Sequence, residues 1–167
     1  MSIKLLILDV DGTMTSGKIT YSNSGEEFKS FCVKDGLAIA SWIRLGGRVA
    51  IITGRESKIV ERRAKELGIE FFYQKIKDKA GKAEEILEKL NIGWESVAAI
   101  GDDLNDYSML KRAKQSFAPS NAVVYIKQCV NSVLSAQGGE GAVREMIELI
   151  IKQEGLYKEY LSLWDAE

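Results

Sequence analysis

Two aspartates stand close together at the end of the first apolar run in this sequence. The run "LLILDVDGTMTSG" places Asp9 and Asp11 two positions apart, directly after residues suited to a buried strand. Two unit charges about 4 Å apart repel each other by roughly 4 kcal/mol at an effective dielectric constant of 20. Asp9 and Asp11 are therefore expected to have a chemical role that offsets this repulsion.

Further polar residues follow two later apolar runs, "RVAIIT" and "VAAIG". Ligands of parallel sheets bind beyond the carboxyl ends of the strands, so the polar residues at those ends are expected to converge. Several carboxylates at one edge would have to take up protons or bind a cation, and hard oxygen ligands suit Mg²⁺. The residues that follow the two runs are Thr53, Gly54, Arg55, Asp102, Asp103, Asn105 and Asp106.

The same edge also carries groups suited to a phosphoryl group. The Thr53 hydroxyl, the amides around Gly54, and Lys79 or Lys82 at the start of a predicted helix are all hydrogen-bond donors. With a phosphate held there, one carboxylate of the first pair could be an in-line nucleophile that forms an aspartyl-phosphate. The other could protonate the leaving oxygen and then deprotonate the attacking water.

Composition narrows the possible functions. The chain has 167 residues, a formal net charge of −1 and no histidine, which excludes histidine-based hydrolases and leaves carboxylates for acid–base chemistry. Mixed charges and the lack of a long apolar run predict no nucleic-acid or membrane partner and a cytoplasmic protein. Cys32 and Cys129 are expected to be free thiols. Small molecules or copies of the chain are the expected partners.

Apolar periodicity predicts an α/β fold with a mostly parallel sheet and helices on both faces. A hairpin is expected after the first strand because the turn residues of "SNSGE" separate two alternating runs. Expected strands cover residues 3–8, 18–21, 27–33, 48–53, 69–73, 97–101, 116–118 and 132–134. Expected helices cover residues 35–45, 57–68, 79–90, 106–113 and 142–153, with a short segment around 122–128.

Four motifs, "DVDGT", "ITGR", the lysine of "KDKAGK" and "GDDLND", resemble in order those of the haloacid dehalogenase (HAD) superfamily of phosphohydrolases. The stretches "GEEFKSFCVKDGLAI" and "GGEGAVREMIELI" are similar to its sugar-acid phosphatases, which act on 3-deoxy-D-manno-octulosonate 8-phosphate or nonulosonate 9-phosphates. The resemblance covers roughly residues 4–153. It implies a Mg²⁺-dependent phosphomonoesterase of sugar-acid and lipopolysaccharide biosynthesis.

The resemblance also implies roles for single residues. Asp9 would be the nucleophile, Asp11 the acid–base, and Lys79, rather than Lys82, a phosphoryl holder with Thr53. Mg²⁺ would be held by the carboxylates of Asp9 and Asp102 and the backbone carbonyl of Asp11. Gly54 and Asn105 would also contact the phosphate, and Asp103 and Asp106 would support the metal ligands from one layer outside them. Contacts to the sugar acid are assigned to Lys34, Asp35, Arg55, Arg144 and the Gly138–Gly141 loop.

The spacing of the motifs leaves no room for a cap domain. We expect one HAD-like catalytic domain, residues 1–153, with a hairpin flap at about 17–33 and a C-terminal tail, 154–167. A small exposed site would stay wet, so another subunit is expected to cover it. The resemblance implies a homotetramer in which hairpins assemble and the C-terminal region reaches an adjacent site.

Three other functions are open at this point. The chain could be a HAD phosphatase for another small phosphate, because Ser16 stands where the sugar-acid phosphatases often have an acid. It could be a non-catalytic partner of a sugar-acid biosynthesis enzyme, against which the intact Asp9 and Asp11 speak. A receiver-like signalling module also uses clustered acids, but receivers have two adjacent acids after the first strand. In this chain the spaced pair Asp9 and Asp11 follows the first strand, and the adjacent pair Asp102 and Asp103 comes late.

Overall fold

A parallel six-stranded sheet forms the centre of the computed structural model, which describes residues 1–166. Its strands lie in the order β5-β4-β1-β6-β7-β8. All five pairings are parallel, which agrees with the predicted fold class. The strands are β1 (Leu5–Leu8), β4 (Arg48–Ile52), β5 (Phe71–Tyr73), β6 (Val97–Ile100), β7 (Gln115–Ala118) and β8 (Ser132–Val133).

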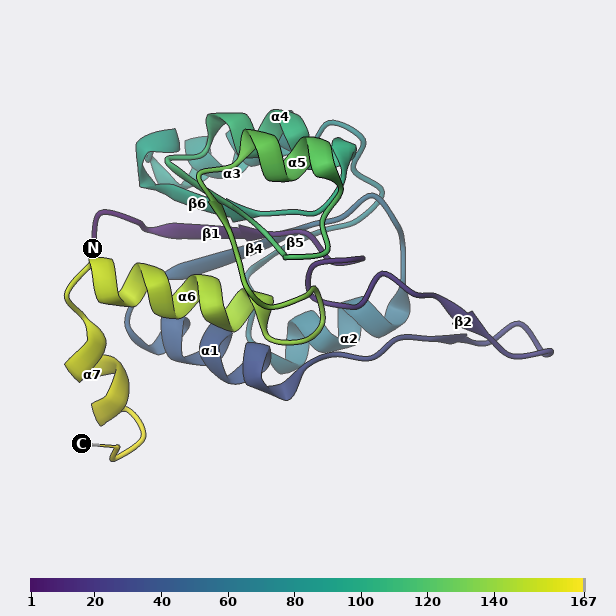
Figure 1. Cartoon of the computed structure of the whole chain (residues 1–167), viewed down its shortest axis with the longest axis horizontal. Helices are drawn as coiled ribbons and strands as arrows, with labels where there is room; N and C mark the ends of the chain where they lie inside the picture. Colours follow the sequence, from purple (N-terminus) through teal and green to yellow (C-terminus); the bar gives the residue numbers. More distant parts are fainter. Residues whose placement is uncertain (167) are drawn as a thin grey trace.

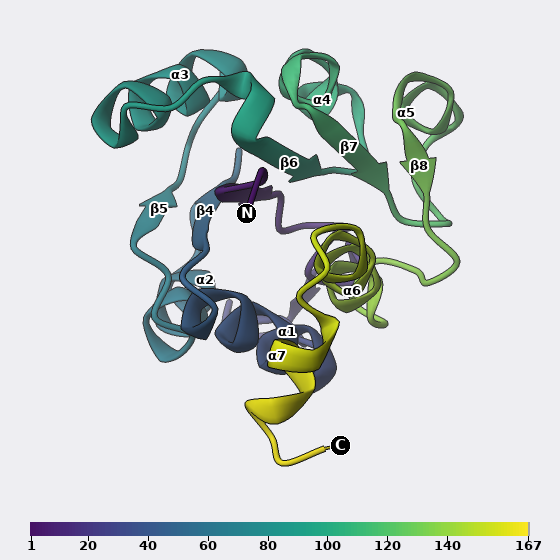
Figure 2. The same cartoon turned by 90° about the vertical axis from the view of Figure 1, so that its left-hand side faces the viewer.

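Helices cover both faces of this sheet (Figure 2). One face carries α1 (Val33–Arg44), α2 (Lys58–Glu66), α6 (Ala142–Gln153) and α7 (Tyr157–Ser162), and the other carries α3 (Lys79–Leu90), α4 (Tyr107–Arg112) and α5 (Val124–Cys129). Two short 3₁₀ turns, η1 (Trp94–Ser96) and η2 (Leu104–Asp106), flank β6.

Strand β1 explains why the sheet has two cores. Its four residues are fully buried, with Leu6 and Leu8 in the core under α1 and α6, and Leu5 and Ile7 in the core under α3 and α4. Successive side chains of a strand point to opposite faces, so a continuous apolar run fits a strand that is covered on both sides. The pairing of β1 with both β4 and β6 fixes the ends of these three strands beside one another.

The predicted hairpin is present but shorter than expected. Strands β2 (Thr20–Tyr21) and β3 (Glu27–Phe28) pair antiparallel and extend away from the sheet (Figure 1). The chain from Val33 onward belongs to α1, so the predicted strand through residue 33 ends too late. The helix predicted from residue 35 thus begins two residues earlier, so Asp35 lies inside its first turn and Cys32 stands at the N-cap position.

The C-terminal segment contains a helix that the sequence did not predict. Within α7, Tyr160 is buried, and the Trp164 indole nitrogen beyond the helix donates a hydrogen bond to the Ser41 hydroxyl of α1 at 2.9 Å. Residues 157–164 thus pack against their own chain, near the amino ends of the strands (Figure 1). The predicted short segment around residues 122–128 forms α5. In the described part of the chain, no helix has the length and hydropathy needed to cross a bilayer.

Candidate active site

A polar cavity opens at the carboxyl ends of β1, β4 and β6. Its volume is about 150 Å³. Parallel register brings these three strand ends together, as the sequence predicted for the residues that follow them. The cavity is lined by Asp9, Asp11, Thr53, Gly54, Arg55, Asp102, Asp103 and Asn105.

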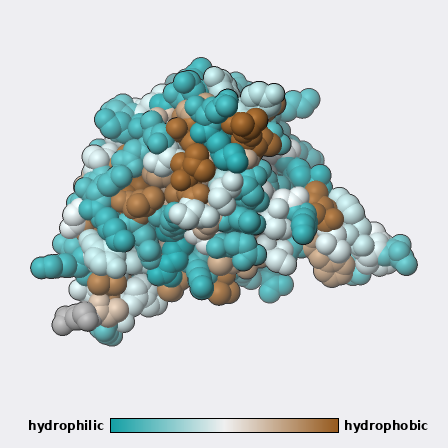
Figure 3. All heavy atoms as spheres, in the orientation of Figure 1, coloured by the Kyte–Doolittle hydropathy of each residue, from teal (hydrophilic) through white to brown (hydrophobic). Residues whose placement is uncertain are grey.

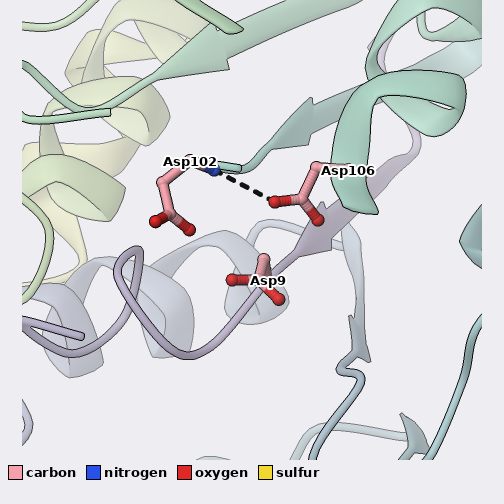
Figure 4. Close-up of side chains that lie close together, drawn as sticks. All are labelled: Asp9, Asp102 and Asp106. Atoms are coloured by element: carbon pink, nitrogen blue, oxygen red, sulfur yellow. Dashed lines mark hydrogen bonds between the residues drawn. The ribbon is translucent and has the colours of Figure 1, made fainter. Parts of the chain in front are cut away.

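Three carboxylates form the inner part of the site. Oxygens of Asp9, Asp102 and Asp106 all lie within 4.8 Å of one another. Asp9 follows β1, while Asp102 and Asp106 come from the loop and the η2 turn after β6 (Figure 4). Asp9 and Asp106 are buried and Asp102 is half-buried, so water screens their mutual repulsion poorly.

Lys79 is the cation that meets this cluster. Its side chain is fully buried, and its ammonium donates to Oδ1 of Asp9 and to Oδ1 of Asp106, both at 2.5 Å. Burial alone would lower the pKa of Lys79, but the charges of Asp9 and Asp106 raise it above its ordinary value. Lys79 therefore stays protonated and neutralises part of the cluster.

The structure distinguishes Lys79 from Lys82, the other lysine of α3 that the sequence offered as a hydrogen-bond donor to the phosphoryl group. Lys82 pairs with Glu85 at 2.5 Å and lies over the ring of Tyr73, 5.0 Å from its centroid. Asp78 caps α3 by accepting a hydrogen bond from the Gly81 amide at 3.0 Å, which fixes the first turn that carries Lys79. Lys79 alone of the two faces the acids.

Asp106 connects Lys79 to the loop that carries Asp102 and Asp103. Its Oδ2 accepts hydrogen bonds from the backbone amides of Asp102 at 3.0 Å and Asp103 at 3.3 Å, while its Oδ1 receives Lys79. Asp103 accepts from the Leu104 amide at 2.7 Å, and Asp103 and Asp106 form a capping box at the start of η2. Both oxygens of Asp106 are thus engaged by the protein, and its bond to the Asp102 amide fixes the loop that carries Asp102.

The cluster has the charge and donor atoms to hold a divalent cation. Burial, then the charge of Asp106, raises the pKa of Asp9 well above its ordinary value despite the bonds from Lys79. The same two causes, in the same order, raise the pKa of Asp102 to about 6. One ammonium thus leaves excess negative charge among three acids. Hard carboxylate oxygens without sulfur or imidazole fit Mg²⁺.

Gly12 allows Asp102 to reach the cluster. Its φ is +97°, and a β-carbon placed there would lie 2.1 Å from Oδ2 of Asp102. Any other residue would meet both backbone strain and a clash with that carboxylate. The Thr13 hydroxyl lies beside the same group and donates to Oδ1 of Asp102 at 3.3 Å. The turn after β1 is therefore shaped around a residue that follows β6.

Asp11 differs from Asp9 in its surroundings. The strand ends at Leu8 and Asp11 already lies in a turn, so the two acids do not share an extended geometry. Oδ1 of Asp11 accepts from the ammonium of Lys29, and Oδ2 lies 3.9 Å from Nε of Arg55. Each of the two aspartates thus meets its own lysine.

Lys29 is a site residue that sequence reasoning missed. It lies one position beyond β3, in the "EEFKSF" segment that follows the hairpin turn. Alternation along an extended segment places Glu27 and Lys29 on one side and Phe28 on the other, and two charged residues on one side could have pointed to the site. The sequence alone gave no indication that this side faces Asp11.

Arg55 ties the hairpin to the edge of the cavity. Its guanidinium lies 3.4 Å from Glu27 and donates to the Tyr21 hydroxyl at 3.2 Å. Glu27 also accepts a hydrogen bond from the Ser57 hydroxyl at 2.7 Å, and this bond is the main reason that its pKa is lowered. The Ser57 amide in turn donates to Gln74 at 2.7 Å. The base of the hairpin is fixed by these contacts next to the predicted phosphate-binding loop.

Thr53 and Gly54 line the cavity from the loop after β4. Thr53 is buried, and its amide and carbonyl bond to Tyr73 and Ile76 at 3.0 and 3.1 Å, which holds the loop after β4. A β-carbon at Gly54 would lie 3.8 Å from the amide nitrogen of Asn105. The predicted phosphate-binding residues Thr53, Gly54 and Asn105 are therefore neighbours.

Three candidate sugar-acid contacts do not line the cavity. Lys34 is exposed at the start of α1. Asp35 accepts a hydrogen bond from the backbone amide of Arg144 at 2.8 Å, and so a residue of α1 caps the first turn of α6. Burial raises the pKa of Asp35, and backbone hydrogen bonds from Arg144 and Gly141 offset part of the effect. The Arg144 guanidinium pairs with Glu148 at 2.7 Å. Within one chain these residues join α1 to α6.

The glycine loop before α6 packs behind the aspartate turn. The Gly139 amide donates to the Thr13 carbonyl at 3.0 Å, and a β-carbon at Gly138 would lie 1.8 Å from the carbonyl oxygen of Gly12. The Gly138 amide donates to Asn121 at 3.0 Å. This close backbone approach requires glycine at position 138. It links the Gly138–Gly141 loop to the turn that carries Asp11.

Comparison with known proteins agrees with this geometry. A model of the haloacid dehalogenase-like hydrolases matches residues 72–147. The 3-deoxy-D-manno-octulosonate 8-phosphate phosphatase of Haemophilus influenzae is 38% identical over 154 residues, which are 92% of this chain and 86% of that protein. The phosphatase of the same name from Escherichia coli K12 is 42% identical over 92% of this chain and 82% of its own.

Solved structures agree at the level of the fold. The 3-deoxy-D-manno-octulosonate 8-phosphate phosphatase of Moraxella catarrhalis, in complex with magnesium ion, phosphate ion and KDO, superposes with a TM-score of 0.95 at 37% identity and covers 98% of this chain and 94% of its own. A probable YrbI family phosphatase from Pseudomonas syringae gives a TM-score of 0.95 at 40% identity over 98% and 93% of the two chains. The motifs, the fold and these relatives together show that the chain belongs to the haloacid dehalogenase-like family of hydrolases.

Proposed function

We propose that this protein is a Mg²⁺-dependent phosphomonoesterase that hydrolyses a phosphorylated 2-keto-3-deoxy sugar acid, with 3-deoxy-D-manno-octulosonate 8-phosphate as the leading candidate. The observation that carries the proposal is the buried Asp9–Lys79–Asp106 group beside Asp102 in a cavity that also contains Thr53 and Asn105. The relatives named for this substrate, and the one solved with magnesium, phosphate and KDO, support it.

Asp9 is the proposed nucleophile. Its carboxylate would attack phosphorus, and the bond from phosphorus to the sugar oxygen would break to give an aspartyl-phosphate. Lys79 holds Oδ1 of Asp9 in a fixed orientation, which reduces the reorganisation needed for attack. The Thr53 hydroxyl and the amides near Gly54, which line the same cavity, would donate to phosphoryl oxygens.

Asp11 is the proposed proton carrier. Its carboxyl group would give a proton to the departing sugar oxygen, then take one from the water that attacks the aspartyl-phosphate, which releases phosphate and restores Asp9. Mg²⁺ bound by Asp9, Asp102 and the Asp11 carbonyl would supply charge neutralisation at the phosphoryl oxygens. Asp103 and Asp106 would support the loop that carries Asp102.

The direct test is a phosphate-release panel. Purified protein is given 3-deoxy-D-manno-octulosonate 8-phosphate, nonulosonate 9-phosphates and hexose phosphates, with Mg²⁺ or with excess EDTA. We expect the sugar-acid phosphates to give the highest kcat/KM and EDTA to abolish release. Equal rates on all esters would favour a HAD phosphatase for another small phosphate, and no release from any ester would favour a non-catalytic partner.

Mg²⁺ affinity should fall as the pH is lowered. Because the pKa of Asp102 is raised to about 6, protons compete with the ion at that carboxylate, and binding must release them. From the fraction of carboxylate ionised, we expect affinity at pH 5 to be about tenfold weaker than at pH 7. Isothermal titration with MgCl₂ measures this. In Asp102→Asn the residual affinity should depend less steeply on pH, because Asp9, whose pKa is also raised, remains to take up a proton. Wild-type affinity that is constant between pH 5 and 7 would contradict the prediction.

We further propose that the protein is a homotetramer whose sites are covered by neighbouring subunits. Exposed apolar side chains on and after the hairpin support this proposal, with Tyr21, Phe28 and Val33 exposed by 59, 53 and 78%. Apolar atoms are visible near the hairpin at the right of Figure 3. A two-stranded hairpin is marginally stable without further packing. Sedimentation velocity should show a species of four chains, and an active monomer would remove the proposal.

A further inference from the structure

Lys29 is buried against a single carboxylate of the active site. Its side chain is fully buried, and its ammonium contacts Oδ1 of Asp11, which is 18 residues earlier in the chain. Within residues 1–166, Asp11 is the only carboxylate within 4.0 Å of this ammonium. A buried ammonium is costly unless it is paired, so the contact fixes both groups. Lys29 thus places a charge from the hairpin inside the catalytic region.

The two aspartates after β1 are held by different cations. Lys79 of α3 binds Oδ1 of Asp9, whereas Lys29 and Arg55 flank the two oxygens of Asp11. If Asp11 turned toward Asp9, it would add a fourth negative charge to the acid cluster. The Lys29 contact opposes this rotation, because the rotation would separate the Asp11 carboxylate from the ammonium that attracts it.

The hairpin that carries Lys29 is itself anchored. Glu27, two positions earlier, accepts from Ser57 at 2.7 Å and lies 3.4 Å from Arg55, and the Tyr21 hydroxyl accepts from Arg55. These contacts connect β2 and β3 to the loop after β4. They fix the base of the hairpin, and therefore the position from which Lys29 reaches Asp11.

We propose that Lys29 is a positioning residue for proton transfer: it orients the Asp11 carboxyl group and makes that orientation depend on how the hairpin is seated. This inference rests on the proposed phosphatase function. The transferred proton moves only between Asp11 and the leaving oxygen or the attacking water. The role of Lys29 ends if Asp11 is removed.

The experiment compares Lys29→Met with Lys29→Arg and with Lys18→Met. Lys18 is exposed on the outgoing side of the same hairpin and is the matched control. On the best ester of the panel, Lys29→Met should lower kcat by about 10- to 100-fold and change KM by less than about threefold, because misplacement of a catalytic group affects the chemical step. Lys29→Arg should recover most of kcat, and Lys18→Met should match the wild type.

A double-variant cycle decides whether Lys29 acts through Asp11. In the Asp11→Asn background, Lys29→Met should lower kcat by less than about twofold further, since residues that act as one unit are not additive. A full second loss of 10- to 100-fold would show that Lys29 acts elsewhere and would overturn the proposal. So would wild-type kcat in Lys29→Met.

Hydrogen–deuterium exchange tests the contact without turnover. Residues 18–31 should exchange faster in Lys29→Met and in Asp11→Asn than in the wild type or Lys18→Met. Unchanged exchange in both variants would overturn the contact on which the proposal rests. If the wild type releases phosphate from no ester, the proposed function fails, and the exchange result still decides whether Lys29 fixes Asp11.

Discussion

Asp9→Asn is expected to abolish phosphate release while the fold remains intact. The amide is nearly the same size as the carboxylate and still offers an oxygen to Lys79, but it cannot form an aspartyl-phosphate. Loss of a covalent nucleophile lowers kcat by about 10⁵- to 10⁶-fold in comparable hydrolases. Because burial and neighbouring acids raise the pKa of Asp9, removing its charge should not reduce the free energy of unfolding. Steady-state phosphate release and urea unfolding measure the two effects.

A matched control is available for Asp9→Asn. Asp78→Asn changes another aspartate near the site, but Asn is an equally good N-cap for α3, so activity and stability should stay near those of the wild type. Acid-quenched samples with labelled substrate should contain phosphoenzyme for the wild type and for Asp78→Asn, and none for Asp9→Asn. Activity of Asp9→Asn above about one percent of the wild type would remove Asp9 as the nucleophile.

Lys79→Met is expected to damage both catalysis and stability. The change removes the ammonium that bonds Asp9 and Asp106 and leaves these buried acids without their cation. Breaking a buried ion pair from one side typically costs about 3–5 kcal/mol, so the metal-free protein should unfold at clearly lower urea. Loss of one preorganised donor at the reacting group lowers kcat by about 10²- to 10³-fold, measured with saturating Mg²⁺.

Lys82→Met is the control that separates a specific effect from the general loss of a lysine on α3. Lys82 lies one turn farther along the helix and pairs with Glu85, so its replacement should change kcat by less than about twofold. If Lys79→Met proves too unstable to assay, Lys79→Arg retains the charge and tests the geometry instead. Wild-type kcat in Lys79→Met would refute its role in holding Asp9, and wild-type kcat in Lys79→Arg would show that the charge alone is sufficient.

The pairing of charges in this site is a tertiary property. Asp9, Asp11, Asp102 and Asp106 were identified from their positions after apolar runs, because a strand end is recognisable from local pattern. The partners of each acid are not recognisable in this way. Lys79 is 70 residues from Asp9 and 27 residues from Asp106 in the sequence, and no local periodicity encodes a pairing over such separations. Lys79 and Lys82 have similar local sequence, and only packing makes one fully buried.

The same distinction applies to residues assigned to the sugar acid. Asp35 and Arg144 are far apart in sequence, and the structure uses them to join α1 with the start of α6. The glycines at 138 and 139 were candidates for ligand contact, while in the fold they let two backbones approach closely behind Gly12. Their roles toward substrate remain proposals that depend on neighbouring subunits, whereas their packing is set within one chain.

The sequence by itself determined the α/β class, the positions of the main strands along the chain and the strand ends at which the candidate site residues lie. It could do so because burial on two faces requires continuous apolar runs, and because parallel strands share one ligand-binding edge. Tertiary structure alone decided that Lys29 reaches Asp11, that the Asp106 carboxylate bonds both the Asp102 amide and Lys79, and that α7 packs on its own chain. These contacts join segments distant in sequence, and their free energy depends on burial and geometry that exist only once the chain has folded.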